Sequence, residues 1–172
     1  DQVKVSIHST DGTLIKEFSN KSKENSLKVK NGGNSFVWNM KYPGAKRLDN
    51  MVLWGADFSG AKAVPGNYIV KLKVNDTEMT QEFTIHKDPT SEGSIDDITA
   101  QFEFVNEVNG VVDRAHKAIE NIRNMKKDLK KFQSDYADND SAKDLIEESK
   151  SIIDSVDKIE NELYQTKNQS NQ

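Results

Sequence analysis

The fold is decided between residues 31 and 89, where the clearest segment reads Asn67-Tyr68-Ile69-Val70-Lys71-Leu72-Lys73-Val74. Every second residue from Tyr68 to Val74 is apolar, and this period of two is typical of a strand with one buried face. Pro65-Gly66 just before the segment fits a type II turn. After a further turn at Asn75-Asp76, the same alternation resumes from Met79 to Ile85. These features predict two neighbouring antiparallel strands.

Working outward toward the N-terminus, the segment from Phe36 to Met40 also alternates, and Trp38 lies at its centre. We expect Trp38 to point into the core, because a tryptophan in mid-strand buries a large area. Asp11-Gly12 predicts a hairpin with a two-residue type I′ turn. Further short strands are predicted at four places, residues 3–7, 14–18, 27–29 and 51–54. About seven short strands with frequent turns predict an antiparallel β-sandwich of immunoglobulin-like type.

Beyond Asp88-Pro89 the periodicity changes from two to the three-and-four spacing of helices. Ser94 can cap the first helix, with an acidic residue three positions later. The apolar stripe then predicts a helix over about residues 95–133, and a second helix is predicted over about residues 141–167. Because the connection between them is short and polar, we expect a long antiparallel helical hairpin.

The second helix carries the spacing of a coiled-coil seam, which predicts the face it turns toward the first helix. Ile146 and Ile153 lie beside this seam, and Phe104 and Val108 lie beside the stripe of the first helix. A stripe broader than one seam faces more than one neighbour. We therefore expect self-association of the chain as a homodimer through the helices. The predicted seam consists of Ala142, Leu145, Ser149, Ile152, Val156, Ile159 and Leu163.

Charge divides the chain at the same point. Residues 1–89 contain 13 Lys and Arg against 10 Asp and Glu, whereas residues 90–172 contain 11 against 18. A shift of net charge from +3 to −7 together with a change of periodicity predicts two domains. The predicted class is therefore α+β, with a sandwich domain at 1–89 and a helical domain at 90–172. No apolar run is long enough for a membrane span.

The residues carry no pattern of catalysis. His8, His86 and His116 lack the spacing of metal ligands, and with no cysteine in the chain neither a disulfide nor a thiolate site can form. Lys126-Lys127 and Lys130-Lys131 make a small basic patch in a net-acidic region, which does not indicate nucleic-acid binding. We expect no catalytic, metal or cofactor site. Tyr42 and Trp54 are the candidate ligand-surface residues, because exposed aromatic rings can stack on a sugar or contact a peptide.

One resemblance covers essentially the whole chain. It rests on three segments that contain a Gly-Asn-x-Phe-x-Trp piece and a Pro-Gly-x-Tyr piece, namely Gly33–Gly44, Met51–Trp54 and Ala63–Tyr68. These resemble the C-terminal region of large bacterial sortilin-like proteins with BNR/Asp-box β-propeller repeats, often labelled glycosyl hydrolases. Asn39 departs from the family, which usually has Asp there. The two pieces are also similar to immunoglobulin-like modules of flagellar hook-capping and secretion-sorting proteins.

The resemblance implies an immunoglobulin-like module followed by helices, with a further helical stretch after the second one. It also implies a secreted, periplasmic or cell-envelope location and a parent β-propeller as a partner. Because the propeller lies outside this sequence, no catalytic residue is carried over. The expected function is that of a non-catalytic accessory module that packs on or spaces the propeller, or binds a protein ligand. The alternative is a carbohydrate-binding or glycoside-hydrolase-associated module.

Overall fold

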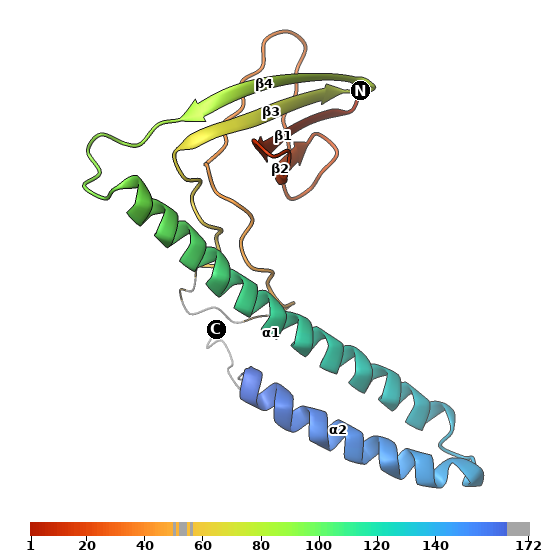
Figure 1. Cartoon of the computed structure of the whole chain (residues 1–172). Helices are drawn as coiled ribbons and strands as arrows, with labels where there is room; N and C mark the ends of the chain where they lie inside the picture. The colour runs from red at the N-terminus through yellow and green to blue at the C-terminus, as the bar shows by residue number, and fades with distance from the viewer. Residues whose placement is uncertain (50, 52–54, 56, 165–172) are drawn as a thin grey trace. The chain divides into compact units, whose positions relative to one another are not determined.

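The computed structural model describes residues 1–49, 51, 55 and 57–164. The protein is α+β, with one four-stranded antiparallel sheet and two long helices (Figure 1). Its contacts divide the chain into two compact units. Unit 1 comprises residues 1–44 and 59–109, and unit 2 comprises residues 45–58 and 110–172. The strands are β1 (Val3–Ser9), β2 (Leu14–Ser19), β3 (Gly66–Val74) and β4 (Thr77–Ile85).

The sheet has the strand order β2-β1-β3-β4, and every neighbouring pair is antiparallel (Figure 1). The predicted alternation in β3 is confirmed at its centre, where Val70 pairs with Ile7 and Leu72 pairs with Val5 across β1. Directly paired side chains lie on the same face, so apolar groups collect on one side. Ion pairs Lys4–Glu17 and Lys71–Glu78 lie on the other side.

The core of unit 1 sits on the apolar face of the sheet. Its buried centre is formed by Ile7, Ile15, Ala63 and Tyr68. Trp38 packs against this centre, as predicted, and its ring meets those of Tyr68 and Phe83 edge-on. The indole nitrogen donates a hydrogen bond of 3.2 Å to the Lys41 carbonyl, which satisfies the polar atom that the tryptophan brings into the core.

Two predicted strands are absent from the described residues. Neither residues 27–29 nor residues 36–40 form a strand, although Trp38 and Met40 alternate toward the core. Met40 has a φ of 56°, a left-handed conformation that ends an extended run. Beyond it the backbone makes only an isolated bridge, Lys41 to Lys62. The alternation therefore reflects packing onto the sheet rather than membership of a second sheet. Of the strand predicted at 51–54, residues 52–54 lie outside the described residues.

The first hairpin has a longer loop than predicted. The Ser9 amide donates to the Thr13 carbonyl at 3.0 Å, which leaves three residues in the loop. Gly12 has a φ of 87°, and a left-handed third residue is typical of three-residue hairpin loops. The Asp11 carboxylate accepts hydrogen bonds from the Ser9 hydroxyl and the Thr13 amide, and these bonds stabilise the three-residue loop over the predicted two-residue turn.

Helix α1 runs from Ile95 to Asp135, close to the predicted range of 95–133. Its start is the predicted cap. The Ser94 hydroxyl accepts from the Asp97 amide at 3.0 Å, and the Asp97 carboxylate accepts from the Ser94 amide at 2.9 Å. This reciprocal pair is a capping box. Residues 95–109 of α1 belong to unit 1 and residues 110–135 to unit 2. The predicted domain boundary at 89/90 falls inside unit 1 and stays a prediction.

Unit 2 includes a segment that comes from the middle of the strand region. Within residues 45–58, Ala45 and Leu48 are buried, and the Lys46 amide donates to Asp113 of α1 at 2.7 Å. His116 is buried and hydrogen-bonded through Nδ1 to the Lys46 carbonyl, so Nδ1 carries the proton of that bond. His116 is therefore a packed polar residue of unit 2.

Helix α2 runs from Lys143 to Leu163, inside the predicted range of 141–167, after a short 3₁₀ helix at Asp140–Ala142. The face that it turns toward α1 agrees with the predicted seam only in part, because Ser149 of that seam lies on it together with Glu160, which is outside the seam. Ser149 and Glu160 are buried there and bond to α1. Ile146 and Ile153, predicted as flanking residues, are half-buried. Four residues of the predicted seam are exposed instead, namely Leu145, Ile152, Ile159 and Leu163.

Candidate interaction surfaces

Tyr42, a predicted ligand-surface residue, is half-buried within unit 1. Its ring meets Phe102 edge-on with 4.8 Å between the centroids, and its amide donates to the Ala61 carbonyl at 2.9 Å. Burial raises the pKa of the Tyr42 hydroxyl to about 12, and the neighbouring Tyr68 adds to the shift. Tyr42 is therefore held by packing and does not present a flat free ring. Trp54 lies outside the described residues, so the aromatic ligand surface stays a prediction.

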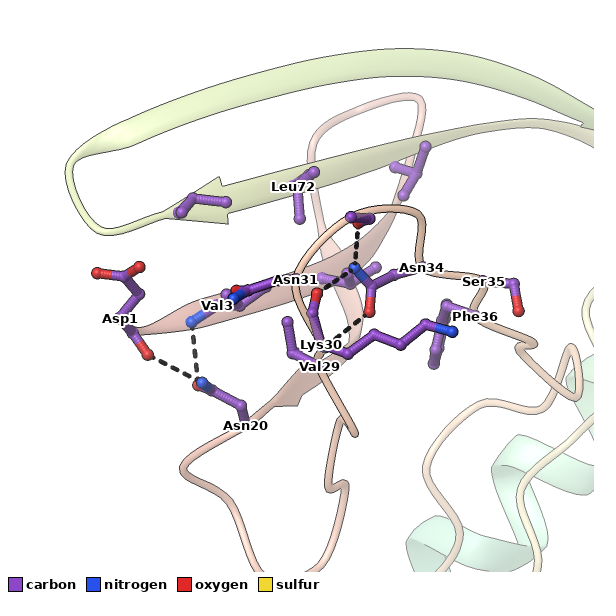
Figure 2. Close-up of a pocket in the computed structure, with 14 residues that line it drawn as sticks. Asp1, Val3, Asn20, Val29, Lys30, Asn31, Asn34, Ser35, Phe36 and Leu72 are labelled. Carbon is purple, nitrogen blue, oxygen red and sulfur yellow. Dashed lines mark hydrogen bonds between the residues drawn. The ribbon is translucent and has the colours of Figure 1, made fainter.

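A groove of about 720 Å³ lies on the apolar face of the sheet in unit 1 (Figure 2). Its floor is formed by β1 and β3, with Val3 and Leu72 among the side chains that line it. The loop of residues 29–36 forms the opposite wall, and Phe36 is fixed there by an edge-on contact with Phe18 at 4.6 Å. The groove marks the part of the sheet that the core leaves uncovered.

The polar rim of this groove is internally hydrogen-bonded. Asn34 closes its own loop, because its side chain accepts from the Lys30 amide and donates to the carbonyls of Lys30 and Gly32, each at 2.9 Å (Figure 2). Asn20 accepts from the Val3 amide and donates to the Asp1 carbonyl. Of the side chains that line the groove, only those of Asp1 and Lys30 are ionisable. It offers apolar contact rather than acid–base chemistry.

A charged cluster joins α2 to α1 in unit 2. The Glu160 side chain is 4% exposed, and it accepts from Arg123 at 2.8 Å and from Lys126 at 2.6 Å. Lys126 also bonds to Asp157. Further along, Gln133 donates to Ser149 at 2.7 Å, and Ser149 donates to the Ile146 carbonyl. A buried carboxylate needs cationic partners to offset the cost of its burial. Glu160 therefore helps to hold α2 where Arg123 and Lys126 of α1 can reach it.

The pH dependence of this cluster follows from Glu160. Burial on its own would raise the pKa of Glu160, but the hydrogen bonds from Lys126 and Arg123 outweigh it and hold the pKa below the ordinary value of 4.5. A carboxyl with a lowered folded pKa contributes stability that is present above the unfolded pKa and lost as the pH falls through the folded one. The contribution is therefore complete at neutral pH, and it is lost as the pH falls below 4.5 and through the lowered pKa of folded Glu160.

We expect Glu160→Gln to speed amide hydrogen exchange in α2 at neutral pH, because the negative charge that pairs with Arg123 and with Lys126 is removed. As the pH falls through the lowered pKa of Glu160, the unsubstituted chain should lose its advantage, and the stabilities of the two proteins should converge. The measurement is the ratio between the two proteins of the equilibrium constant for opening of α2. It is obtained from amide exchange rates after correction for the pH dependence of the intrinsic exchange rate. Glu147→Gln, at the exposed pair with Lys150, is the control and should change little. A constant ratio across pH 3–7 would contradict this account.

Both helices of unit 2 leave large apolar side chains exposed. Those of α2 recur at intervals of seven and four residues, and Leu145 and Ile159 are 56% and 50% exposed. We call this set the two-helix face. It consists of Val111, Met125 and Tyr136 from α1 with Leu145, Ile152, Ile159 and Leu163 from α2. Several large apolar side chains exposed on two bonded helices make a candidate site of interaction.

Sequence reasoning identified some of these residues and missed others. The spacing of Leu145, Ile152 and Ile159 predicts one stripe in contact with α1, whereas the three side chains are exposed. Glu160 was not singled out, because acidic side chains on a helix are usually solvated. The sequence does contain a pattern that includes Glu160. Glu160 follows Ser149, Ile153 and Val156 at successive spacings of four, three and four residues, which places all four on one face of a helix.

Comparisons with known proteins do not assign this chain to a family. No family model matches the chain, and neither a curated protein nor a solved structure is significantly similar to it. Among the described residues, no cluster of three or more His, Cys, Asp and Glu side chains could hold a metal ion. In the same part of the chain, no helix has the length and apolar character needed to cross a bilayer.

Proposed function

We propose that this chain is a non-catalytic interaction module that binds protein through the two-helix face. The observation that carries the proposal is the exposed Leu145–Ile152–Ile159 repeat on a helix whose other side already bonds to α1 through Ser149 and Glu160. Apolar residues at seven-residue intervals are the pattern by which one helix packs on another. Because α1 is already bonded through a different side of α2, the exposed apolar row is open to a second neighbour.

The order of the contacts supports an antiparallel helical hairpin. Gln133 bonds to Ser149, Lys126 to Asp157 and Arg123 to Glu160. Positions on α2 advance as positions on α1 recede, as expected for two helices that run in opposite directions with a short connection. Within the proposal, the hairpin is the binding element.

The proposed fold of unit 1 is an immunoglobulin-like sandwich with an irregular second layer. Trp38, Met40 and Tyr42 pack on the sheet face from a segment that is not a strand, and they cover the side where Ile7 and Tyr68 lie. This layering supports the proposal, although a second sheet is not present among the described residues. The sandwich would serve as the structural support of the module.

The proposed setting follows from the resemblance to sortilin-like proteins with β-propeller repeats. There the module would follow a propeller in a secreted, periplasmic or cell-envelope protein and would pack against it or space it from a partner. The parent propeller is then one protein that could meet the two-helix face. No reaction is proposed for this chain.

A carbohydrate-binding module is the second candidate. The observation that favours it is the groove in unit 1, where amide side chains of Asn31 and Asn34 lie beside an apolar floor. Amide and apolar groups together can bind a sugar by hydrogen bonds and by contact with its C–H face. The half-buried Tyr42 counts against a flat aromatic platform, so protein binding is preferred.

The test compares the two candidates on one protein. Fluorescently labelled chain at about 10 nM, too dilute for micromolar self-association, is titrated with glycans and with a synthetic amphipathic helix carrying Leu at heptad positions. We expect the helix to bind at micromolar concentration and no glycan to bind. Ile152→Glu/Ile159→Glu should weaken helix binding at least tenfold, because it places charge in an apolar contact.

The matched control is Asn124→Glu/Lys131→Gln, which adds the same negative charge at exposed positions of α1 outside the two-helix face. It should bind the helix like the parent chain. Saturable glycan binding that Asn34→Ala removes, or equal helix binding by both double variants, would refute the proposal.

A further inference from the structure

We infer that the occupant of the two-helix face is the same face of a second copy of this chain, so that two hairpins form a symmetric four-helix bundle. The inference rests on the proposed function and names its partner. It concerns unit 2 alone, which contains α2, residues 110–135 of α1 and the exposed side chains of the two-helix face. The choice of a second copy over a single added helix follows from the direction of the exposed side chains.

On α1, Lys126 and Gln133 mark the direction toward α2, because their side chains bond to it. Successive helical residues are turned by about 100°, so Met125 and Tyr136 point roughly 80–100° to one side of Lys126. On α2, Glu160 marks the direction toward α1. Leu145, Ile152 and Ile159 point roughly 60°, 80° and 100° from Glu160 in the same rotational sense.

Two consequences follow for the pair of helices. Because the contacts place the helices in opposite directions, the same rotational sense puts both exposed rows on the same side of the hairpin. The exposed side chains spread over roughly 60–100° from the contact between the helices, a range that includes the 90° between the two neighbours of a helix in a square four-helix bundle and extends past the 60° of a three-helix bundle. The face therefore fits a partner that is itself two helices wide.

The area of the face agrees with a partner of this size. The seven side chains are between 38% and 56% exposed. At roughly 200 Å² for a large side chain, they expose on the order of 600–700 Å² per copy. Stable interfaces bury about 800 Å² per partner, and the residues between the two rows supply the remainder. A symmetric pairing of identical faces is also the commonest form of protein association.

The first experiment is sedimentation equilibrium of the full chain over about 1–100 μM. We expect a monomer–dimer equilibrium with a micromolar dissociation constant. Ile152→Glu/Ile159→Glu should weaken the dimer at least 30-fold, and Asn124→Glu/Lys131→Gln should leave it unchanged. Circular dichroism checks that helix content is the same in all three proteins. A monomer at about 100 μM, or a dimer that both double variants retain, would overturn the inference.

A second experiment does not depend on charged variants that could disturb folding. The chain has no cysteine, so a single Ile152→Cys thiol can be labelled with maleimide without background. The labelling rate should fall several-fold as the protein concentration rises through the dissociation constant. Asn124→Cys should react at the same rate at every concentration. If the labelling rate of Ile152→Cys does not fall at high protein concentration, a second copy does not cover the two-helix face. If the chain stays monomeric and still binds the helix peptide, the proposed function holds and the partner is another protein.

Discussion

Replacing Gly60 by alanine is expected to destabilise unit 1 by about 3 kcal/mol or more. Gly60 is buried, and a Cβ placed on it would overlap the carbonyl groups of Tyr42 and the carbonyl oxygen of Pro43. These are backbone atoms, so no rotation of a side chain relieves the overlap. Moving the Tyr42 backbone would also disturb its contact with Phe102 and the hydrogen bond from its amide to Ala61.

The measurement is urea unfolding followed by circular dichroism in the far ultraviolet. The matched control is Gly33→Ala, because no atom lies within 4 Å of a Cβ at Gly33 and its backbone angle is open to other residues. That variant should be neutral, or more stable by up to about 1 kcal/mol, since alanine restricts the unfolded chain. Equal unfolding midpoints for the two variants would mean that Gly60 and Tyr42 do not lie as described.

Truncating Ile119 should cost unit 2 about 4 kcal/mol. Ile119 is 1% exposed, and it is the one large side chain below 2% in the described part of the chain. Ile119→Ala removes apolar contacts and leaves a cavity between α1 and its neighbours, and both effects lower stability. With a loss of this size in a small unit, α2 should separate from α1 in a measurable fraction of molecules.

This effect is read from the unfolding free energy and from amide exchange along α2. Val108→Ala is the control on the same helix, because Val108 is 44% exposed. It should cost less than about 1 kcal/mol. An Ile119→Ala chain that keeps the α2 exchange rates of the parent would argue against the packing of α2 on this part of α1.

Local patterns predicted those parts of the fold that local physics determines. The alternation around Val70 and Leu72 reports a one-sided strand, because successive side chains of a strand point to opposite faces. Ser94 and Asp97 determine the start of α1 through hydrogen bonds within one turn. Such features depend on residues a few positions apart, so the sequence alone was sufficient for them.

Other parts depend on contacts between distant residues. The left-handed Met40 has no marker in the sequence, since methionine rarely adopts that conformation. The spacing of Leu145, Ile152 and Ile159 predicts an apolar row but not the neighbour that covers it. The placement of Lys46 against Asp113 and His116 joins positions about 70 residues apart, and periodicity contains no information about such a pairing. The groove depends likewise on how the loop of residues 29–36 folds back over the sheet.

The segment that carries Ala45 and Leu48 also determines an order of events during synthesis. The four strands are complete once Ile85 has left the ribosome, and they can pair at that stage. Ala45 and Leu48 belong with residues from 110 onward, which are made later. Until α1 emerges, these two apolar side chains have no place to pack. The nascent chain therefore passes through a stage in which all four strands are present while Ala45 and Leu48 still lack the later residues of unit 2.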